Sequence, residues 1–218
     1  MTSVRIKIIG AMVCLLIFGT IAYFVVSYNI LPFDTLIQEA IYEFRSKTLT
    51  QTLTIITYMA NWQFITLICT FLIIYPKATR QFGIPLTITA IFCACFQKFI
   101  KSIFHRARPD IALHLIVQGG YSFPSGHSLT GLLFYGMFIL LIRHKLLSID
   151  NKRILTQKNR TIANMLTVLL SLLIFLIGFS RIYLGVHFPT DVIGGWSLSL
   201  TFLFLFSALI PFNKKKSF

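Results

Sequence analysis

Charged residues are scarce in this sequence, where they make up 12% of 218 residues. A soluble domain carries roughly 25% charged residues. Hydrophobic residues account for 56% of the chain, and its mean hydropathy is +0.79. The shortage of charge therefore excludes an ordinary soluble protein and indicates an integral membrane protein. Long apolar runs predict helices rather than barrel strands, because a helix satisfies its own backbone polar groups inside the bilayer.

Cysteine and acidic residues are also few. All four cysteines fall inside apolar runs, which favours small buried side chains over disulfides or metal ligands. The net charge of +14 could indicate nucleic-acid binding, but no such motif is present. The basic residues lie in short loops, where membrane topology and anionic headgroups account for them. No group of Asp, Glu and His resembles a metal site, so we expect no metal and no other cofactor.

Six apolar segments each approach the ~20 residues that a membrane-spanning helix needs. They are approximately Ile8–Tyr28, Thr54–Tyr75, Phe82–Ile100, His127–Ile142, Ala163–Ser180 and Asp191–Pro211. The first run is too long for a signal-peptide core and lacks a clear cleavage site, so we expect an uncleaved span. With no internal repeat and no low-complexity tract, residues 1–218 are predicted to form a single all-α domain, a bundle of six transmembrane helices.

The distribution of Lys and Arg predicts the orientation of this bundle. Six spans place both termini on one side of the membrane, and that side collects 13 of the 20 basic residues. By the positive-inside rule, the termini are expected in the cytoplasm of a cell membrane. The first outer loop carries apolar residues at helical spacing from Phe33 to Phe44, which predicts a short helix in the membrane interface. This helix would either flank the entrance to a site or lie there passively.

Three short strings carry the chemistry of the chain, and all fall at the predicted outer ends of spans. They are Lys101-x6-Arg108-Pro109, Pro124-Ser125-Gly126-His127 and Ser180-Arg181-x5-His187-x3-Asp191. Together they supply cations, two histidines, a carboxylate and a Ser-Gly helix start, a set suited to binding and moving a phosphoryl group. Asp191 could hold one ring nitrogen of His187 and leave the other free as a nucleophile. His127 is placed to donate a proton to a leaving oxygen.

Each feature also has an ordinary structural explanation when it stands alone. A lysine at a span end usually reaches the headgroups, and a lone His–Asp pair is more often structural. His105, Arg106 and His114, which lie near the signature positions, could contact a headgroup or a second phosphate, and we favour solvation at the headgroup level for each. Asn61 and Gln63 are unusual at membrane depth, and we interpret them as residues that hydrogen-bond between helices.

Taken together, the three strings resemble the signature of the type-2 phosphatidic acid phosphatase family. These are lipid phosphatases related to bacterial haloperoxidases and glucose-6-phosphatase. The resemblance covers the core from the third to the sixth span, about residues 82–211, with every signature position filled. It implies that His187 forms a phosphohistidine, that Asp191 orients it, and that His127 protonates the leaving oxygen and later activates water. It also implies a phosphate-binding set made of Lys101, Arg108, Ser125, Gly126 and Arg181.

The resemblance therefore implies a metal-independent lipid phosphate phosphatase with its site at the outer face, similar to the small bacterial phosphatidylglycerophosphatase-B-like members. The family's usual bacterial substrates are undecaprenyl pyrophosphate, phosphatidylglycerophosphate and phosphatidic acid, and all three stay open. Two alternatives also stay open: a phosphotransferase with an acceptor other than water, and a phosphate or lipid transporter that cleaves nothing. The expected partners are the lipid bilayer and a lipid phosphate, without nucleic acid, and the oligomeric state is open.

Overall fold

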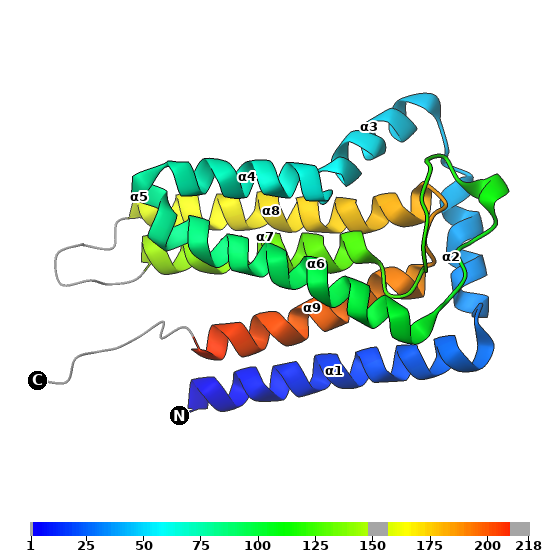
Figure 1. The fold of residues 1–218 in the computed structure, drawn as a ribbon, viewed down its shortest axis with the longest axis horizontal. Helices are drawn as coiled ribbons and strands as arrows, with labels where there is room; N and C mark the ends of the chain where they lie inside the picture. The colour runs from blue at the N-terminus through cyan, green and yellow to red at the C-terminus, as the bar shows by residue number, and fades with distance from the viewer. Residues whose placement is uncertain (1, 148–156, 210–218) are drawn as a thin grey trace, which may run out of the picture.

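A computed structural model describes residues 2–147 and 157–209 of the chain (Figure 1). Over these ranges the protein is built of helices and loops without a strand, which confirms the predicted all-α class. The helices are α1 (Thr2–Tyr28), α2 (Pro32–Tyr42), α3 (Lys47–Tyr58), α4 (Trp62–Ile74), α5 (Pro76–Ala78), the π-helical turn η1 (Thr79–Gly83), α6 (Ile84–Phe104), the short η2 (Ile111–Leu113), α7 (Gly126–Leu147), α8 (Gln157–Tyr183) and α9 (Pro189–Leu209).

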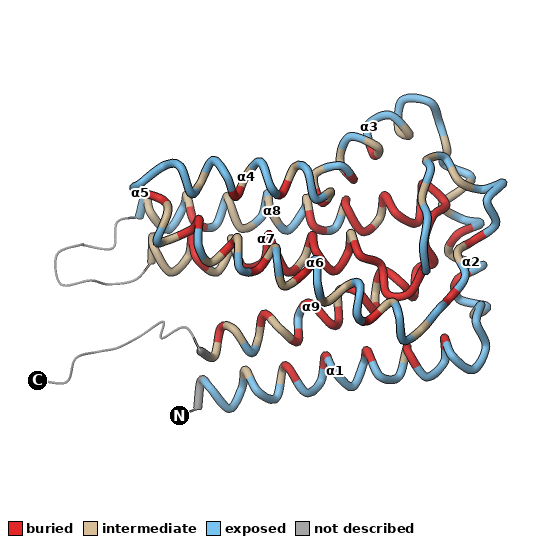
Figure 2. Tube along the Cα trace, in the orientation of Figure 1, coloured by how far each residue is buried: buried red, intermediate tan, exposed pale blue. Residues whose placement is uncertain are grey.

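The membrane-spanning pattern agrees with the sequence. Within the described ranges, five segments are long and apolar enough to cross a bilayer, and the bent pair α3–α4 makes up to six. Many large apolar residues of α1 and α4 are exposed, and much of both helices is pale blue in Figure 2, as expected for helices that face lipid. The predicted end of the last span at Pro211 and the predicted cytoplasmic lysines 214–216 lie outside the described residues, as does part of the basic loop between α7 and α8.

The second span is not the single helix that the sequence predicted. It consists of α3 and α4, which bend by 48° where they meet. Ser46 caps the start of α3 by accepting a hydrogen bond from the Leu49 amide. The backbone of Asn61 is extended, with φ −71° and ψ 151°, and α4 begins afresh after it. This break brings Asn61 to the wall of the cavity described below.

Helix α7 lies at the centre of the bundle and packs against α6, α8 and α9, while α1 packs along α9 (Figure 1). Leu129, Leu133 and Phe134 of α7 are fully buried and form the middle of the main apolar core. The three motif strings all lie at one end of this bundle, opposite the start of α1 and the end of α9. Helix α2 crosses that end, and the α6–α7 loop folds over it.

Candidate active site

The His187–Asp191 pair lies where the loop after α8 enters α9. Pro189 starts α9, and Asp191 sits in its first turn, where the helix dipole favours a negative charge. Asp191 Oδ2 accepts a hydrogen bond from the Phe188 amide at 2.8 Å and lies 3.3 Å from His187 Nδ1. The predicted pairing of the carboxylate with one ring nitrogen is thus present in the structure.

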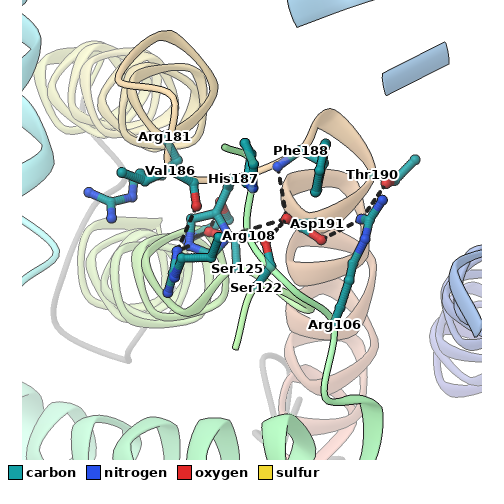
Figure 3. Close-up of polar contacts among 12 residues, drawn as sticks. Arg106, Arg108, Ser122, Ser125, Arg181, Val186, His187, Phe188, Thr190 and Asp191 are labelled. Carbon is teal, nitrogen blue, oxygen red and sulfur yellow. Dashed lines mark hydrogen bonds and ion pairs between the residues drawn. The ribbon is translucent and has the colours of Figure 1, made fainter. Parts of the chain in front are cut away.

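The other ring nitrogen of His187 faces a cation. Arg108 Nη1 lies 3.0 Å from His187 Nε2 (Figure 3). Because a guanidinium can only donate, Nε2 is the accepting nitrogen and Nδ1 carries the proton that points to Asp191. This tautomer places the lone pair on Nε2, and the lone pair becomes available for attack on an electrophile when Arg108 donates to the electrophile's oxygen instead.

Burial and the neighbouring cations keep the imidazole uncharged. Burial lowers the pKa of His187 well below 6.5, and Arg108, Lys101, Arg181 and Arg106 lower it further. Burial also lowers the pKa of Arg108 to about 10, so this guanidinium remains charged at neutral pH. The geometry therefore pairs a neutral imidazole with a charged neighbour, an arrangement suited to attack on a phosphate.

Two glycines let the strings approach one another. A Cβ atom on Gly195 of α9 would lie 2.8 Å from the Ser125 carbonyl oxygen, and one on Gly126 would lie 2.3 Å from Gln97 Oε1 of α6. The Ser125 amide donates to the Asp191 carbonyl oxygen at 3.0 Å. The start of α7 is thereby held against both α6 and α9, which brings residues far apart in the sequence to one site.

Backbone carbonyls hold two of the predicted cations in place. Lys101 Nζ, in the last turn of α6, donates to the Tyr121 carbonyl at 2.6 Å. Arg108 donates to the carbonyls of Val186, Gly119 and Gly120 at 2.6–2.9 Å. The α6–α7 loop thus wraps around both side chains and fixes their charges beside the histidine.

Arg181 is almost fully buried, with 1% of its surface exposed. Its Nη1 donates to Thr57 Oγ1 at 2.9 Å, and its Nη2 donates to Gln118 Oε1 at 2.6 Å. Its Nε atom is buried and has no hydrogen-bond partner among the described residues. Since neither partner of Arg181 is charged, an anion is needed to compensate this guanidinium.

The Pro-Ser-Gly-His string begins α7. Ser125 Oγ accepts hydrogen bonds from the Ser128 amide at 3.4 Å and the Ser128 hydroxyl at 2.9 Å, so it caps the helix. The first amides of a helix have no intrahelical acceptor and are available to an anion. His127 Nε2 contacts Asn61 Oδ1 of the broken span. Asn61 does bond between helices, as predicted, but its partner is a candidate catalytic residue.

Five of the eight predicted site residues line one cavity of about 690 Å³, namely Lys101, Arg108, Gly126, His127 and His187. The other three do not line the cavity: Asp191 contacts His187 from behind, and Ser125 and Arg181 lie behind the cavity wall. Away from this polar end, the cavity continues between α4 and α6 along Ile65, Cys69, Ile73, Ile91 and Ala94. It therefore joins a cationic end to an apolar channel at membrane depth. No group of three or more His, Cys, Asp and Glu residues within the described ranges could hold a metal ion.

The headgroup role expected for Arg106 is wrong. Arg106 is 3% exposed, and its Nη1 donates to Asp191 Oδ1 at 2.6 Å (Figure 3). Ser122, which the sequence did not single out, donates to the second carboxylate oxygen of Asp191 and lies 3.3 Å from His187 Nδ1. A serine in a loop carries no periodic signal, so Ser122 could not have been found from the sequence.

Comparison with known proteins gives one family match. The sequence model of the PAP2 superfamily matches residues 82–215. Phosphatidylglycerophosphatase B of Bacillus subtilis is 36% identical over 110 residues, which are 50% of this chain and 48% of the relative. Undecaprenyl-diphosphatase of Sulfolobus acidocaldarius is 28% identical over 141 residues, 62% of this chain and 59% of that protein. These matches thus span about half the length of the curated relatives.

Two solved structures share the fold. The crystal structure of the first transmembrane PAP2 type phosphatidylglycerolphosphate phosphatase from Bacillus subtilis superposes with a TM-score of 0.78 at 26% identity. That superposition covers 95% of this chain and 98% of the other. Aquifex aeolicus LpxE matches with a TM-score of 0.59 at 23% identity over 80% of this chain and 96% of that one, a likeness of fold alone.

Proposed function

Because this chain belongs to the PAP2 superfamily, we propose that it hydrolyses the phosphate ester or pyrophosphate of a membrane lipid through a phosphohistidine intermediate and without a metal ion. The family membership confirms the resemblance seen in the three strings. The cavity carries the proposal: its polar end holds His187, His127 and fixed cations, and its apolar channel suits a lipid tail. Relatives that match half or more of this chain are named as phosphatidylglycerophosphatase B and undecaprenyl-diphosphatase, which supports the lipid class.

In the first step, the lone pair of His187 Nε2 attacks phosphorus and the bond from phosphorus to the lipid oxygen breaks. The negative charge of the bound phosphate lets His127 carry a proton, and His127 gives this proton to that oxygen, so the lipid leaves as an alcohol or as a lipid monophosphate. The phosphoryl group remains on Nε2, and Asp191 stabilises the positive charge that the imidazole ring gains. Lys101, Arg108 and the start of α7 neutralise the equatorial oxygens.

In the second step, His127 accepts a proton from water while the water oxygen attacks phosphorus. The phosphorus–nitrogen bond breaks, inorganic phosphate leaves, and His187 returns to its neutral form. Phosphoryl transfer needs in-line positioning and charge neutralisation, which three fixed cations supply here. The proposal therefore requires no metal ion at any stage.

Phosphate release from purified protein in detergent tests this function. We expect inorganic phosphate from at least one of undecaprenyl pyrophosphate, phosphatidylglycerophosphate and phosphatidic acid, at the same rate with and without EDTA. Glycerol 3-phosphate, which has no tail for the apolar channel, is the matched control and should be cleaved at least about 10-fold more slowly. Loss of activity in EDTA with recovery in Mg²⁺ contradicts the metal-free mechanism. Consumption of the lipid phosphate without release of inorganic phosphate favours a phosphotransferase. The absence of cleavage of any lipid phosphate favours a transporter.

We also propose that the site faces the outside of the cell. The cytoplasmic assignment of the opposite end rests on its many basic residues, among them Lys77 and Arg80 between α4 and α6. A short-chain phosphatidic acid added to intact cells that express the protein should be hydrolysed at the rate seen after permeabilisation. Cells that express the His187→Ala variant provide the background. Hydrolysis that begins only after permeabilisation contradicts the outward orientation.

A further inference from the structure

Helix α2 buries two polar side chains and exposes two large apolar ones. Asp34 is fully buried and Gln38 is 6% exposed, whereas Phe33 and Leu36 are 48% and 67% exposed. The sequence predicted an interfacial helix by its apolar face, and that face does point outward. The buried polar face is the informative one, because a fully buried carboxylate is costly unless it is paired and hydrogen-bonded.

Asp34 is paired with Arg106. Arg106 Nη2 donates to Asp34 Oδ2 at 2.7 Å, and Asp34 also accepts from the Thr190 amide at 2.9 Å and the Thr190 hydroxyl at 2.8 Å. The other terminal nitrogen of Arg106 donates to Thr190 Oγ1 and to Asp191 Oδ1, as Figure 3 shows. One guanidinium therefore bridges a carboxylate from α2 and the carboxylate that faces the nucleophile.

Neither residue of this pair reaches the substrate. Arg106 and Asp34 are absent from the lining of the catalytic cavity. Arg106 Nε is held by the Asn29 carbonyl at 2.8 Å, and the Phe188 ring lies 4.2 Å from the guanidinium carbon. The hydrogen bonds of Arg106 use four of its five N–H donors, and none of the residues that accept them lines the catalytic cavity.

The bridge decides how the Asp191 carboxylate is oriented. Arg106 takes Oδ1, so that Oδ2 is left for His187 Nδ1, the Phe188 amide and the Ser122 hydroxyl. The charge of Asp34 offsets the charge of Arg106, which leaves the full negative charge of Asp191 for the imidazole. Gln38, one turn after Asp34, contacts the His187 carbonyl at 3.4 Å and ties the same loop to α2.

We propose that Asp34 and Arg106 are a positioning pair that holds the Asp191 carboxylate in the orientation and at the charge that the His187 nucleophile requires. The inference rests on the proposed function of His187 and adds to it two residues that are not signature positions: Asp34 lies on α2, and Arg106 fills an unspecified position of the first string. It also gives α2 a role in catalysis through its buried face, in place of the passive interfacial role.

The pH dependence of kcat separates positioning from mere structural support. The charged and titratable groups around His187 are Lys101 of α6, Arg106 and Arg108 of the following loop, His127 of α7, Arg181 of α8 and Asp191 of α9. The neutral imidazole is the nucleophile, so the rate falls as the pH drops through its pKa. That pKa is lowered by burial and by these cations, and the fall of the wild-type rate that comes from protonation of His187 should therefore lie well below pH 6.5.

The fall of kcat at acid pH is the acid limb of the pH profile, and two substitutions should move it in opposite directions. Arg106→Gln removes a cation, which stabilises the imidazolium and moves the limb to higher pH. Asp34→Asn removes an anion, which moves the limb to lower pH. Because the carboxylate loses its fixed orientation, kcat of Arg106→Gln should fall about 10²-fold, with KM changed less than about twofold. The double variant removes the unpaired buried carboxylate as well, and should recover about 10-fold of that loss.

The measurements are kcat and KM between about pH 4 and pH 8, the range in which imidazoles titrate. All variants are assayed with the same lipid phosphate, so that the ionisation of the substrate is common to them. An increase in KM at unchanged kcat overturns the proposal, because Arg106 would then bind substrate. The proposal is also overturned if Arg106→Gln and Asp34→Asn lose kcat equally, leave the acid limb where it is and lower the Tm, because the pair would then be structural only. If Arg106→Gln does not fold in detergent, Asp34→Asn and Thr190→Val carry the same test. A wild-type protein that cleaves no lipid phosphate refutes the proposed function instead.

Discussion

Replacement of His187 by alanine is expected to reduce phosphate release by at least about 10⁴-fold, because the variant has no atom to receive the phosphoryl group. The structure places His187 at the cavity, with Nε2 beside Arg108 and Nδ1 against Asp191. The remaining cations can still bind the substrate, so KM should change much less than kcat. The rate is measured with a saturating lipid phosphate in detergent with EDTA present.

The matched control is His144→Gln in the last turn of α7, at the end of the bundle away from the site. Its activity should remain within about twofold of the wild type. Wild-type protein quenched during turnover with ³²P-labelled lipid should carry label that survives alkali and is lost in acid, as a phosphohistidine does, and His187→Ala should carry none. Label that survives acid but is lost in alkali identifies an acyl phosphate instead and moves the nucleophile to Asp191. Wild-type activity in His187→Ala contradicts the assignment altogether.

The spans and the three strings could be predicted because each leaves a local signal in the sequence. Apolar runs near the thickness of a bilayer mark α1, α6, α7, α8 and α9, and an all-helical bundle follows from them. The strings combine residue types that are rare at membrane depth with fixed spacings. Their meeting at one end of the bundle follows from topology alone, since successive spans alternate in direction.

The break in the second span and the partners of Arg106 could not be predicted, because both depend on tertiary contacts. Hydropathy averages across residues 59–61 and therefore predicts one continuous helix, while the cavity wall at Asn61 requires two. The apolar spacing of α2 correctly predicted a helix. The partner of Asp34, however, is 72 residues away in the sequence, and nothing local identifies it. For the same reason Arg106 was interpreted as a headgroup contact.

Replacement of Arg181 by methionine is expected to make the protein more stable and almost inactive. Arg181 is 1% exposed and its partners, Thr57 and Gln118, are neutral. A buried charge without a carboxylate destabilises the free protein, and an apolar side chain of similar volume is neutral or stabilising. In the proposed reaction the same charge acts from behind the cavity wall on a phosphoryl group that gains negative charge on its oxygens. Its removal should therefore reduce kcat by about 10³-fold.

Thermal unfolding in detergent and phosphate release measure the two halves of this prediction. Orthovanadate, a mimic of the five-coordinate phosphorus, should inhibit the wild type and raise its Tm by mass action. It should raise the Tm of Arg181→Met far less, because the compensating cation is gone. Gln118→Leu is the matched control: it keeps the guanidinium but removes one of its supports, so kcat should fall only about 10-fold. A variant Arg181→Met that loses stability together with activity contradicts this view, because the guanidinium would then support the fold rather than stabilise the charge of the phosphoryl group.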